Sequence, residues 1–134
     1  HIADSLEAAL HDADVVMLCT SSAKAVLDPQ TLSKPALITS ISTNAPRAHE
    51  VPPQSLNDMD VFCDYRQTTP GSAGEMLIAS EQFGWDVSKI VGDLPELLSD
   101  YVARPDYQRH VFFRSIGLGL EDVALANALY RLHN

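Results

Sequence analysis

The chain has few basic residues and no long apolar run, and each shortage argues against a class of function. Its 9 Lys and Arg residues stand against 18 Asp and Glu, which gives a formal net charge of −9 at pH 7. Such a surface lacks the basic excess that displaces counterions from nucleic acid or from an anionic membrane. No apolar run approaches the roughly 20 residues that a helix needs to span a bilayer. We therefore expect neither a nucleic-acid partner nor a membrane partner.

Cysteine is also scarce. Cys19 and Cys63 are too few for a disulfide framework or a sulfur-rich metal site. Both stand in apolar runs, so we expect each to be a small buried hydrophobic residue in a reducing compartment. The five histidines are scattered, without the spacing of metal ligands. The sequence therefore predicts no metal site.

Apolar runs separated by helical or looped segments organise the 134 residues, about one domain's worth. Continuous apolar runs of this kind are typical of strands covered on both faces. They predict strands at 15–19, 36–42, 61–65 and 110–114. Helical spacing predicts helices at 4–11, 75–83 and 119–132, and shorter turns or helices after Pro29, Pro52 and Pro95. The alternation indicates an α/β layered fold with a mostly parallel sheet.

Polar residues stand where these strands end. In open α/β sheets, ligands bind beyond the carboxyl ends of the strands. We therefore expect the strand ends to converge on a crevice of the nucleotide-binding type. The groups concerned are Thr20, Ser21 and Ser22, then Ser42, Thr43 and Asn44, then Asp64, and finally Ser115, Gly117 and Gly119.

The turn at 115–119 is the strongest of these signals. It links an apolar strand to a helix that begins with Glu121 and Asp122. A turn of this kind leaves backbone N–H groups and a hydroxyl free to meet a ligand. Its glycines allow the backbone to approach a flat ring closely. The alternative is a simple strand-to-helix turn.

Each of the other strand ends also has a structural alternative. The hydroxyls of 20–22 can bond a ribose or phosphate, or can cap a following turn. Asn44 can orient a carboxamide or carboxylate, or can form an Asx turn; its amide does not titrate, so it is no general base. Asp64 is either catalytic or a loop cap, and Glu75 is expected to stabilise a helix N-terminus. His49 and Glu50 look like an acid–base pair, but such neighbours more often belong to a solvated loop.

Taken in order, these landmarks resemble the ornithine cyclodeaminase/mu-crystallin family from about Ser5 to Tyr130. The order and spacing of the pieces carry the resemblance. They are Ala13–Val16 with Thr20–Ser22, Ile41–Pro46 with Glu50–Val51, Val61–Asp64 with Gly74–Glu75, Val91–Leu94, and Phe113–Gly117 with Glu121–Asp122.

The resemblance implies a Rossmann-like domain in a cytoplasmic, NAD- or NADP-dependent enzyme that forms a homodimer. By similarity, Thr20, Ser21 and Ser22 line the cofactor and Ser42 and Asn44 lie near the nicotinamide. Ser115, Gly117 and Leu118 are expected to contact its ring. Residues 1–134 would form the C-terminal part of the nucleotide-binding domain, with a returning helix at about 119–133.

Two departures from the family change what we expect: one concerns the extent of the domain and the other concerns the reaction. Members carry an upstream Gly-rich dinucleotide loop that these residues lack, so we expect a partial domain without turnover by itself. Ornithine cyclodeaminases carry Asp where Asn44 stands, and Asn44 cannot accept a proton. The resemblance therefore favours reduction of a small cyclic imino acid, such as pyrroline- or piperideine-2-carboxylate, with Asn44 as an orienting residue. The alternatives are an ornithine cyclodeaminase and a non-catalytic mu-crystallin-like protein that binds cofactor or a small ligand.

Overall fold

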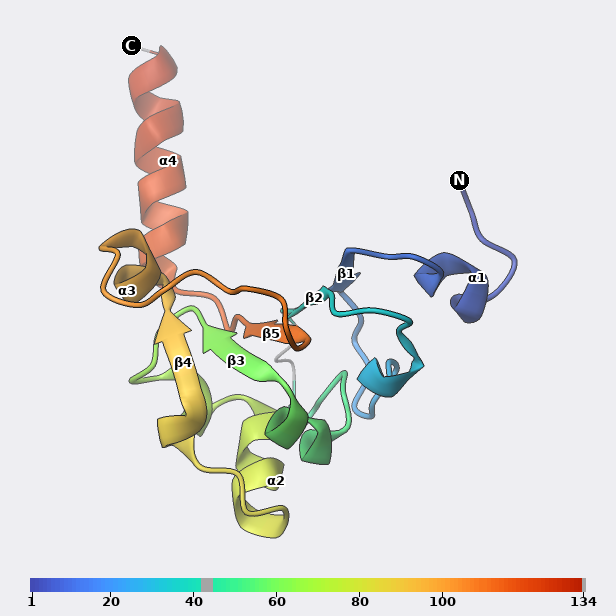
Figure 1. Ribbon diagram of the computed structural model, residues 1–134. Helices are drawn as coiled ribbons and strands as arrows, with labels where there is room; N and C mark the ends of the chain where they lie inside the picture. Colours follow the sequence, from blue (N-terminus) through green and yellow to red (C-terminus); the bar gives the residue numbers. More distant parts are fainter. Residues whose placement is uncertain (42–44, 134) are drawn as a thin grey trace.

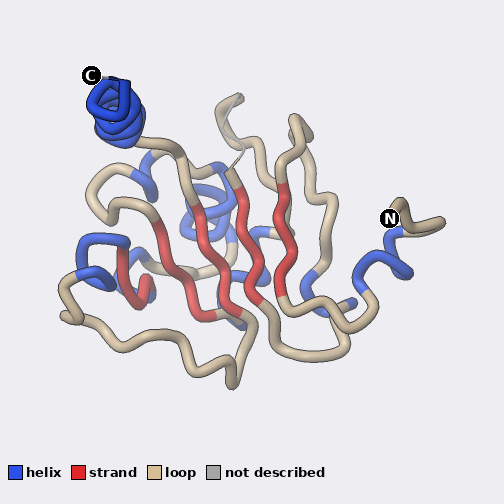
Figure 2. The backbone as a smooth tube through the Cα atoms, turned by 90° about the horizontal axis from the view of Figure 1, so that it is seen from above, coloured by secondary structure: helices blue, strands red, loops and turns tan. Residues whose placement is uncertain are grey.

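A parallel sheet forms the centre of the computed structural model, which describes residues 1–41 and 45–133 (Figures 1 and 2). The strands follow the order β1-β2-β5-β3-β4, and every neighbouring pair runs parallel. Their carboxyl ends therefore lie along one edge of the sheet. The prediction of an α/β fold with a parallel sheet is confirmed. The bounds are β1 Val15–Leu18, β2 Leu37–Ser40, β3 Asp60–Cys63, β4 Ile90–Asp93 and β5 Val111–Arg114.

The helices are short apart from two. Local caps fix their starts: the Ser5 side chain accepts the Ala8 N–H at the first helix, and Asp93 and Glu96 form a capping box at the third. The α-helices are α1 Leu6–Leu10, α2 Gly74–Gln82, α3 Leu94–Leu98 and α4 Gly119–His133. The 3₁₀ turns are η1 Pro29–Thr31, η2 Pro53–Asp58, η3 Thr69–Gly71 and η4 Val87–Lys89.

The main core lies between one face of the sheet and the layer that contains α2 and η2 (Figure 1). Ile38, Phe112 and Val61 lie side by side across β2, β5 and β3, and all three are buried. The segment that leads from α3 to β5 crosses the other face, where it lines one side of an open, mostly apolar pocket of about 310 Å³. The central strand β5 is thus covered on both faces.

β4 is a strand that the sequence did not predict, because the stretch 90–94 was expected only to lead into a helix. Gly92 and Asp93 interrupt the apolar run after Ile90 and Val91, so it is too short to stand out as a strand. Gly92 is nevertheless required there. A Cβ at this position would lie 2.5 Å from the Val102 side chain, which packs over the strand.

The prediction that β1 is covered on both faces is wrong. Val15 and Met17 are 54% and 70% exposed, because β1 is an edge strand and this face has no cover within the described residues. Cys19, just beyond the strand, is exposed and so departs from the expected burial. Cys63 is buried as predicted, since its strand lies inside the sheet.

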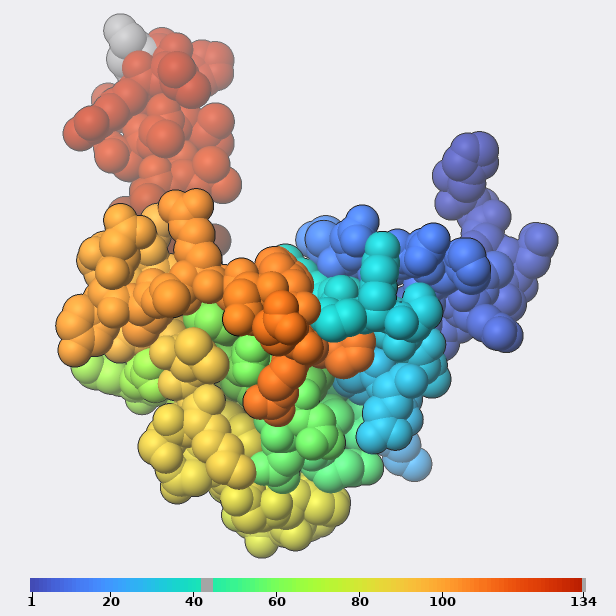
Figure 3. Space-filling view, in the orientation of Figure 1, coloured from blue at the N-terminus to red at the C-terminus, as the bar shows by residue number. Residues whose placement is uncertain are grey.

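α4 stands clear of the rest of the molecule (Figure 3). It has no buried residue, and its apolar side chains, Leu120 and Leu132 among them, are largely exposed. None of the described helices combines the length and apolar character required to cross a membrane.

Candidate functional site

The carboxyl edge of the sheet brings most of the predicted strand-end groups together. The Ser115 N–H donates to the Ser40 carbonyl at 3.0 Å, and the Asp64 N–H donates to the Arg114 carbonyl at 3.1 Å. The exits of β2, β5 and β3 are therefore joined by backbone hydrogen bonds. Thr20–Ser22 follow β1 at the same edge. Ser42, Thr43 and Asn44, which were predicted at the exit of β2, lie outside the described residues.

Asp64 organises the centre of this edge. Its side chain is fully buried, and Oδ2 accepts hydrogen bonds from Ser115 Oγ at 3.1 Å, Ile116 N at 2.8 Å and Gly117 N at 3.0 Å. Oδ1 accepts the Tyr65 N–H at 2.9 Å and the Thr69 hydroxyl. Asp64 is thus a cap that joins two loops, which decides between the two roles considered for it.

This arrangement corrects one expectation about the 115–119 turn. The N–H groups of Ile116 and Gly117 and the Ser115 hydroxyl are not free for a ligand, because all three donate to Asp64. The physical reason is that a buried carboxylate is costly unless several donors satisfy it.

The outer surface of the turn is nevertheless open. Gly117 is exposed and has φ +77°, a backbone conformation that residues other than glycine rarely adopt. No atom lies within 4 Å of the position that a Cβ would occupy there, or at Gly119. Leu118 between them is half-buried. The turn therefore presents an open surface at its two glycines, which leaves room for contact with a planar ring.

The exit loop of β1 is held from within by its own hydroxyls. The Ser22 N–H donates to Thr20 Oγ1 at 3.1 Å, and Ser22 Oγ donates to the Lys24 carbonyl at 2.7 Å. These contacts correspond to the capping role considered for the hydroxyls. Thr20 and Ser21 are exposed, so their outer atoms can still meet a ligand.

Glu50 is a buried residue that sequence reasoning assigned to a solvated loop, and that assignment is wrong. Its side chain is 1% exposed, and Oε1 accepts the Thr20 N–H at 2.7 Å while Oε2 accepts Ser40 Oγ at 2.7 Å. Its carbonyl accepts the N–H groups of Val26 and Leu27. The only local signal was the apolar Ala48 and Val51 nearby; the contacts themselves are with distant residues.

A buried ion pair lies beside Glu50. Arg114 Nε lies 2.7 Å from Glu75 Oε1, and both side chains are at most 1% exposed. Arg114 Nη1 also donates to Ser40 Oγ at 2.9 Å. Burial raises the pKa of Glu75, and the guanidinium opposes that rise. Glu75 does lie in the first turn of α2, as expected, but it also pairs with an arginine that the sequence analysis did not single out.

These contacts link the strand ends into one network. It runs from Glu75 through Arg114 and Ser40 to Glu50 and the backbone of Thr20. The network fixes the position of the exit loops and contains no exposed nucleophile. Among the residues that the structure describes, no group of three or more His, Cys, Asp or Glu is arranged to hold a metal ion.

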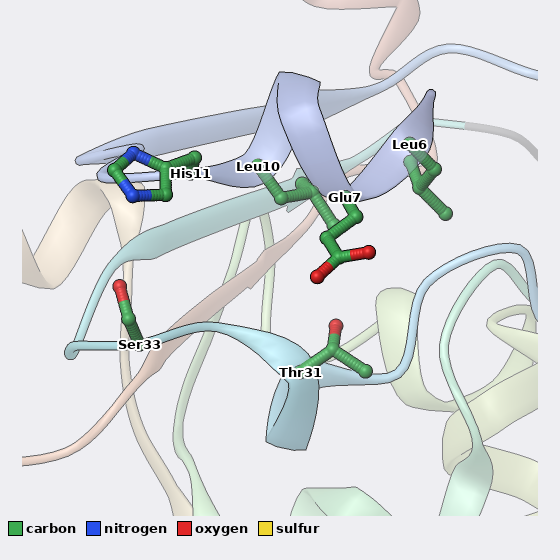
Figure 4. A pocket seen from close by; sticks show the side chains of 6 residues that line it. All are labelled: Leu6, Glu7, Leu10, His11, Thr31 and Ser33. Carbon is green, nitrogen blue, oxygen red and sulfur yellow. The ribbon is translucent and has the colours of Figure 1, made fainter. Parts of the chain in front are cut away.

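A separate cavity of about 540 Å³ lies away from the predicted site residues, between α1 and the stretch from the end of η1 to Ser33 (Figure 4). The Glu7 carboxylate points into it from α1. None of the predicted site residues lines it. The residues around it are Leu6, Glu7, Leu10, His11, Thr31 and Ser33.

Comparisons with known proteins agree with this architecture. The sequence profile of the ornithine cyclodeaminase/mu-crystallin family matches residues 1–133. The chain is 73% identical, over 97% of its length, to the NAD(P)H-dependent anabolic L-arginine dehydrogenase DauB of Pseudomonas aeruginosa. It covers 41% of that relative.

Two solved structures show the same fold. One is the Δ¹-pyrroline-2-carboxylate reductase of Thermococcus litoralis in complex with NADH and L-proline, with a TM-score of 0.87 and 19% identity over 96% of this chain and 40% of that one. The other is the iminosuccinate reductase of Paracoccus denitrificans in complex with NAD⁺, with a TM-score of 0.80 and 25% identity over 96% and 39%. The expected Rossmann-like layered fold is confirmed. The chain spans about two fifths of the length of each of these proteins.

Proposed function

The chain belongs to the ornithine cyclodeaminase/mu-crystallin family, and from that membership we propose that it forms the nicotinamide-binding part of an oxidoreductase that reduces an imino acid with NADH or NADPH. The observation that carries the proposal is the 73% identity to an NAD(P)H-dependent L-arginine dehydrogenase over 97% of this chain. The parallel sheet, with polar exit loops joined at its carboxyl edge, supports it.

The residues at this edge fit the nicotinamide end of a dinucleotide. The open glycine surface at Gly117 suits a planar ring, and the exposed Thr20 and Ser21 offer hydroxyls to the ribose or phosphates. When bound, the reduced nicotinamide supplies a hydride to the imine carbon. In this proposal Ser115, Gly117 and Leu118 lie against the ring, Thr20, Ser21 and Ser22 line the cofactor, and Ser42 and Asn44 orient nicotinamide or substrate. Residues 1–134 then form the C-terminal part of the nucleotide-binding domain.

The identity to the arginine dehydrogenase favours the imine of 5-guanidino-2-oxopentanoate as the substrate, with L-arginine as the product. Reduction needs a correctly placed iminium carbon and hydrogen bonds that orient it. The amide of Asn44 provides such bonds without a proton transfer. A small cyclic imino acid of the pyrroline- or piperideine-2-carboxylate type has the same C=N bond beside a carboxylate, and is the second candidate.

The experiment uses the longest natural polypeptide that contains these residues. Oxidation of NADH and of NADPH is followed with 5-guanidino-2-oxopentanoate plus ammonia, and with pyrroline-2-carboxylate. Reduction of either imino acid supports the proposal, and the first is expected to be faster. Ammonia release from ornithine with NAD⁺ would instead identify a cyclodeaminase. Cofactor binding without turnover would identify a binding protein.

Two controls accompany this assay. The 134-residue chain by itself is expected to show no turnover, because it lacks the Gly-rich dinucleotide loop. Replacement of Asn44 by alanine in the longer protein is expected to change kcat or KM for the imine. Unchanged values would remove Asn44 from the site.

The homodimer and the cytoplasmic location that the family resemblance implies belong to the same proposal. Sedimentation of the longer protein and its distribution between cell fractions test them.

A further inference from the structure

We propose that Asp64 is a positioning residue for hydride transfer, because it sets the conformation of the turn Ser115–Gly117 against which the nicotinamide lies. This inference rests on the proposed function. Asp64 touches neither cofactor nor substrate in this account. It acts through the turn, by drawing the turn's N–H groups inward.

The Asp64 carboxylate bridges the turn Ser115–Gly117 and the chain that follows β3, and we call this bridge the clamp. One oxygen, Oδ2, accepts from three donors of the turn: the Ser115 hydroxyl and the N–H groups of Ile116 and Gly117. The other oxygen, Oδ1, is held by the Tyr65 N–H and the Thr69 hydroxyl on the β3 side. With both oxygens bonded, the carboxylate cannot rotate without breaking one set of bonds. The turn is therefore fixed relative to β3.

Within the described residues, two other contacts of this turn stand out: the Ser115 N–H donates to the Ser40 carbonyl at 3.0 Å, and the partly buried Ile116 side chain packs against the core. β5 is held up to Arg114 by pairing with β2 and β3 and by the ion pair to Glu75. The chain then becomes half-buried at Ser115 and exposed at Gly117. α4, which follows, has no buried residue. Loss of the Asp64 carboxylate should therefore change the conformation of the turn more than the position of β5.

The clamp also decides what the turn can offer to a ligand. The N–H groups of Ile116 and Gly117 donate to Asp64, and that of Ser115 donates to the Ser40 carbonyl. The backbone polar groups that the turn Ser115–Gly117 has left for the cofactor are therefore its carbonyl oxygens, which only accept. Together with the open surface at Gly117, this matches a planar ring that carries a donor. The carboxamide NH₂ of nicotinamide is such a donor.

Asp93 provides a matched control. It stands at the carboxyl end of the neighbouring strand β4, is 5% exposed, and accepts backbone N–H groups from Arg66 at 3.0 Å and Glu96 at 3.0 Å. It therefore has the same chemistry and nearly the same burial as Asp64, but it holds a loop and α3 instead of the Ser115–Gly117 turn.

The test compares Asp64→Asn with Asp93→Asn in the longest natural polypeptide that contains the chain. Cofactor Kd is measured by NADH fluorescence, and kcat by imine reduction. Amide hydrogen exchange at Ile116 and Gly117 is measured in the 134-residue chain.

Asp64→Asn is expected to speed exchange at both amides. It should raise the cofactor Kd about tenfold, as expected if the competent turn is populated about one tenth of the time. It should also lower kcat by about 10- to 100-fold, the usual cost of a small misplacement. Asp93→Asn should leave all three unchanged. Should Asp64→Asn fail to fold, Thr69→Val removes one anchor of the clamp and is expected to shift Kd and kcat in the same direction by less.

The inference is overturned if Asp64→Asn speeds exchange but leaves Kd and kcat as in the wild type, or if Asp93→Asn changes them equally. A wild-type protein that binds NADH but reduces no imino acid would refute the proposed function alone. The Kd comparison would then still decide the role of Asp64. A wild-type protein that binds neither dinucleotide would overturn both.

Discussion

Replacing Arg114 by methionine removes the positive partner of a carboxylate that has no access to water. Arg114 Nε lies 2.7 Å from Glu75 Oε1, and the two side chains are 1% and 0% exposed. Methionine has similar length and fills the apolar part of the site, so the variant changes charge more than volume. Glu75 then remains buried. Its carboxylate is either charged without its cation or becomes neutral by binding a proton, and either state costs free energy.

Breaking a buried ion pair from one side costs about 3–5 kcal/mol, because the remaining charge is uncompensated. Small domains have total stabilities of about 5–15 kcal/mol, so this loss is a large fraction. Removing both charges, with Arg114→Met and Glu75→Gln together, is expected to restore most of it. The exposed pair Arg47–Glu81 is the control: its side chains are 45% and 52% exposed, and Arg47→Met is expected to cost about 0–1 kcal/mol.

The pH dependence of the folding stability provides an independent test of this ion pair. Burial raises the pKa of Glu75 in the folded chain above its value in the unfolded chain. The folded state then holds the proton more tightly, so its stability is greatest below the unfolded pKa and falls as pH rises through the folded pKa. Loss of the guanidinium, which opposes the rise, raises the folded pKa further. The deficit of Arg114→Met should therefore shrink as pH falls from 7 towards 5.

Urea unfolding of the 134-residue chain and its variants, monitored by Trp85 fluorescence, measures these differences. The reasoning is refuted if Arg114→Met costs no more than Arg47→Met, or if the double variant is no more stable than Arg114→Met alone.

Two further predictions concern single titrating groups. Burial, helped by the charges of Asp64 and Asp93, raises the pKa of the Cys63 thiol to about 12, whereas Cys19 is exposed. In the native chain at pH 8, alkylation should label Cys19 alone, because only about 10⁻⁴ of Cys63 is thiolate; labelling of both at equal rates would contradict this. His110 Nδ1 accepts the Ala36 N–H at 3.2 Å, and burial lowers its pKa from 6.5. Because the unfolded chain protonates first, His110 should cost stability as pH falls below about 6.5. His110→Gln, which keeps an acceptor, should lose less stability between pH 7.5 and 5.5 in urea unfolding; an identical loss would show that His110 does not contribute.

Most strands of the sheet could be predicted because each is one continuous apolar run in the sequence. Runs such as 61–65 and 110–114 identify themselves without knowledge of their neighbours. β4 was missed because Gly92 and Asp93 interrupt its apolar run after two residues. The reason for that glycine, the side chain of Val102 above it, lies ten residues away. The edge position of β1 was equally invisible, since a run of apolar residues does not report what covers it.

The candidate site was predicted in outline and not in detail, for the same physical reason. The general rule that strand ends converge located Thr20, Asp64 and Ser115 at one edge of the sheet. The hydrogen bond between Asp64 and Gly117, however, joins residues 53 positions apart, and the one between Glu50 and Thr20 joins residues 30 positions apart. No local pattern signals either contact. Charged residues in loops are most often solvated, so buried ones are found only when the fold brings their distant partners together.

The central claim is that the exits of β1 and β5 form the nicotinamide end of a dinucleotide site. Hydrogen–deuterium exchange of the longest natural polypeptide, with and without NADPH or NADH, tests it most directly. The account predicts slower exchange on cofactor binding in the peptides that contain Thr20–Ser22 and Ser115–Leu118. Slower exchange confined to other segments, such as those around the cavity between α1 and Ser33, would contradict it.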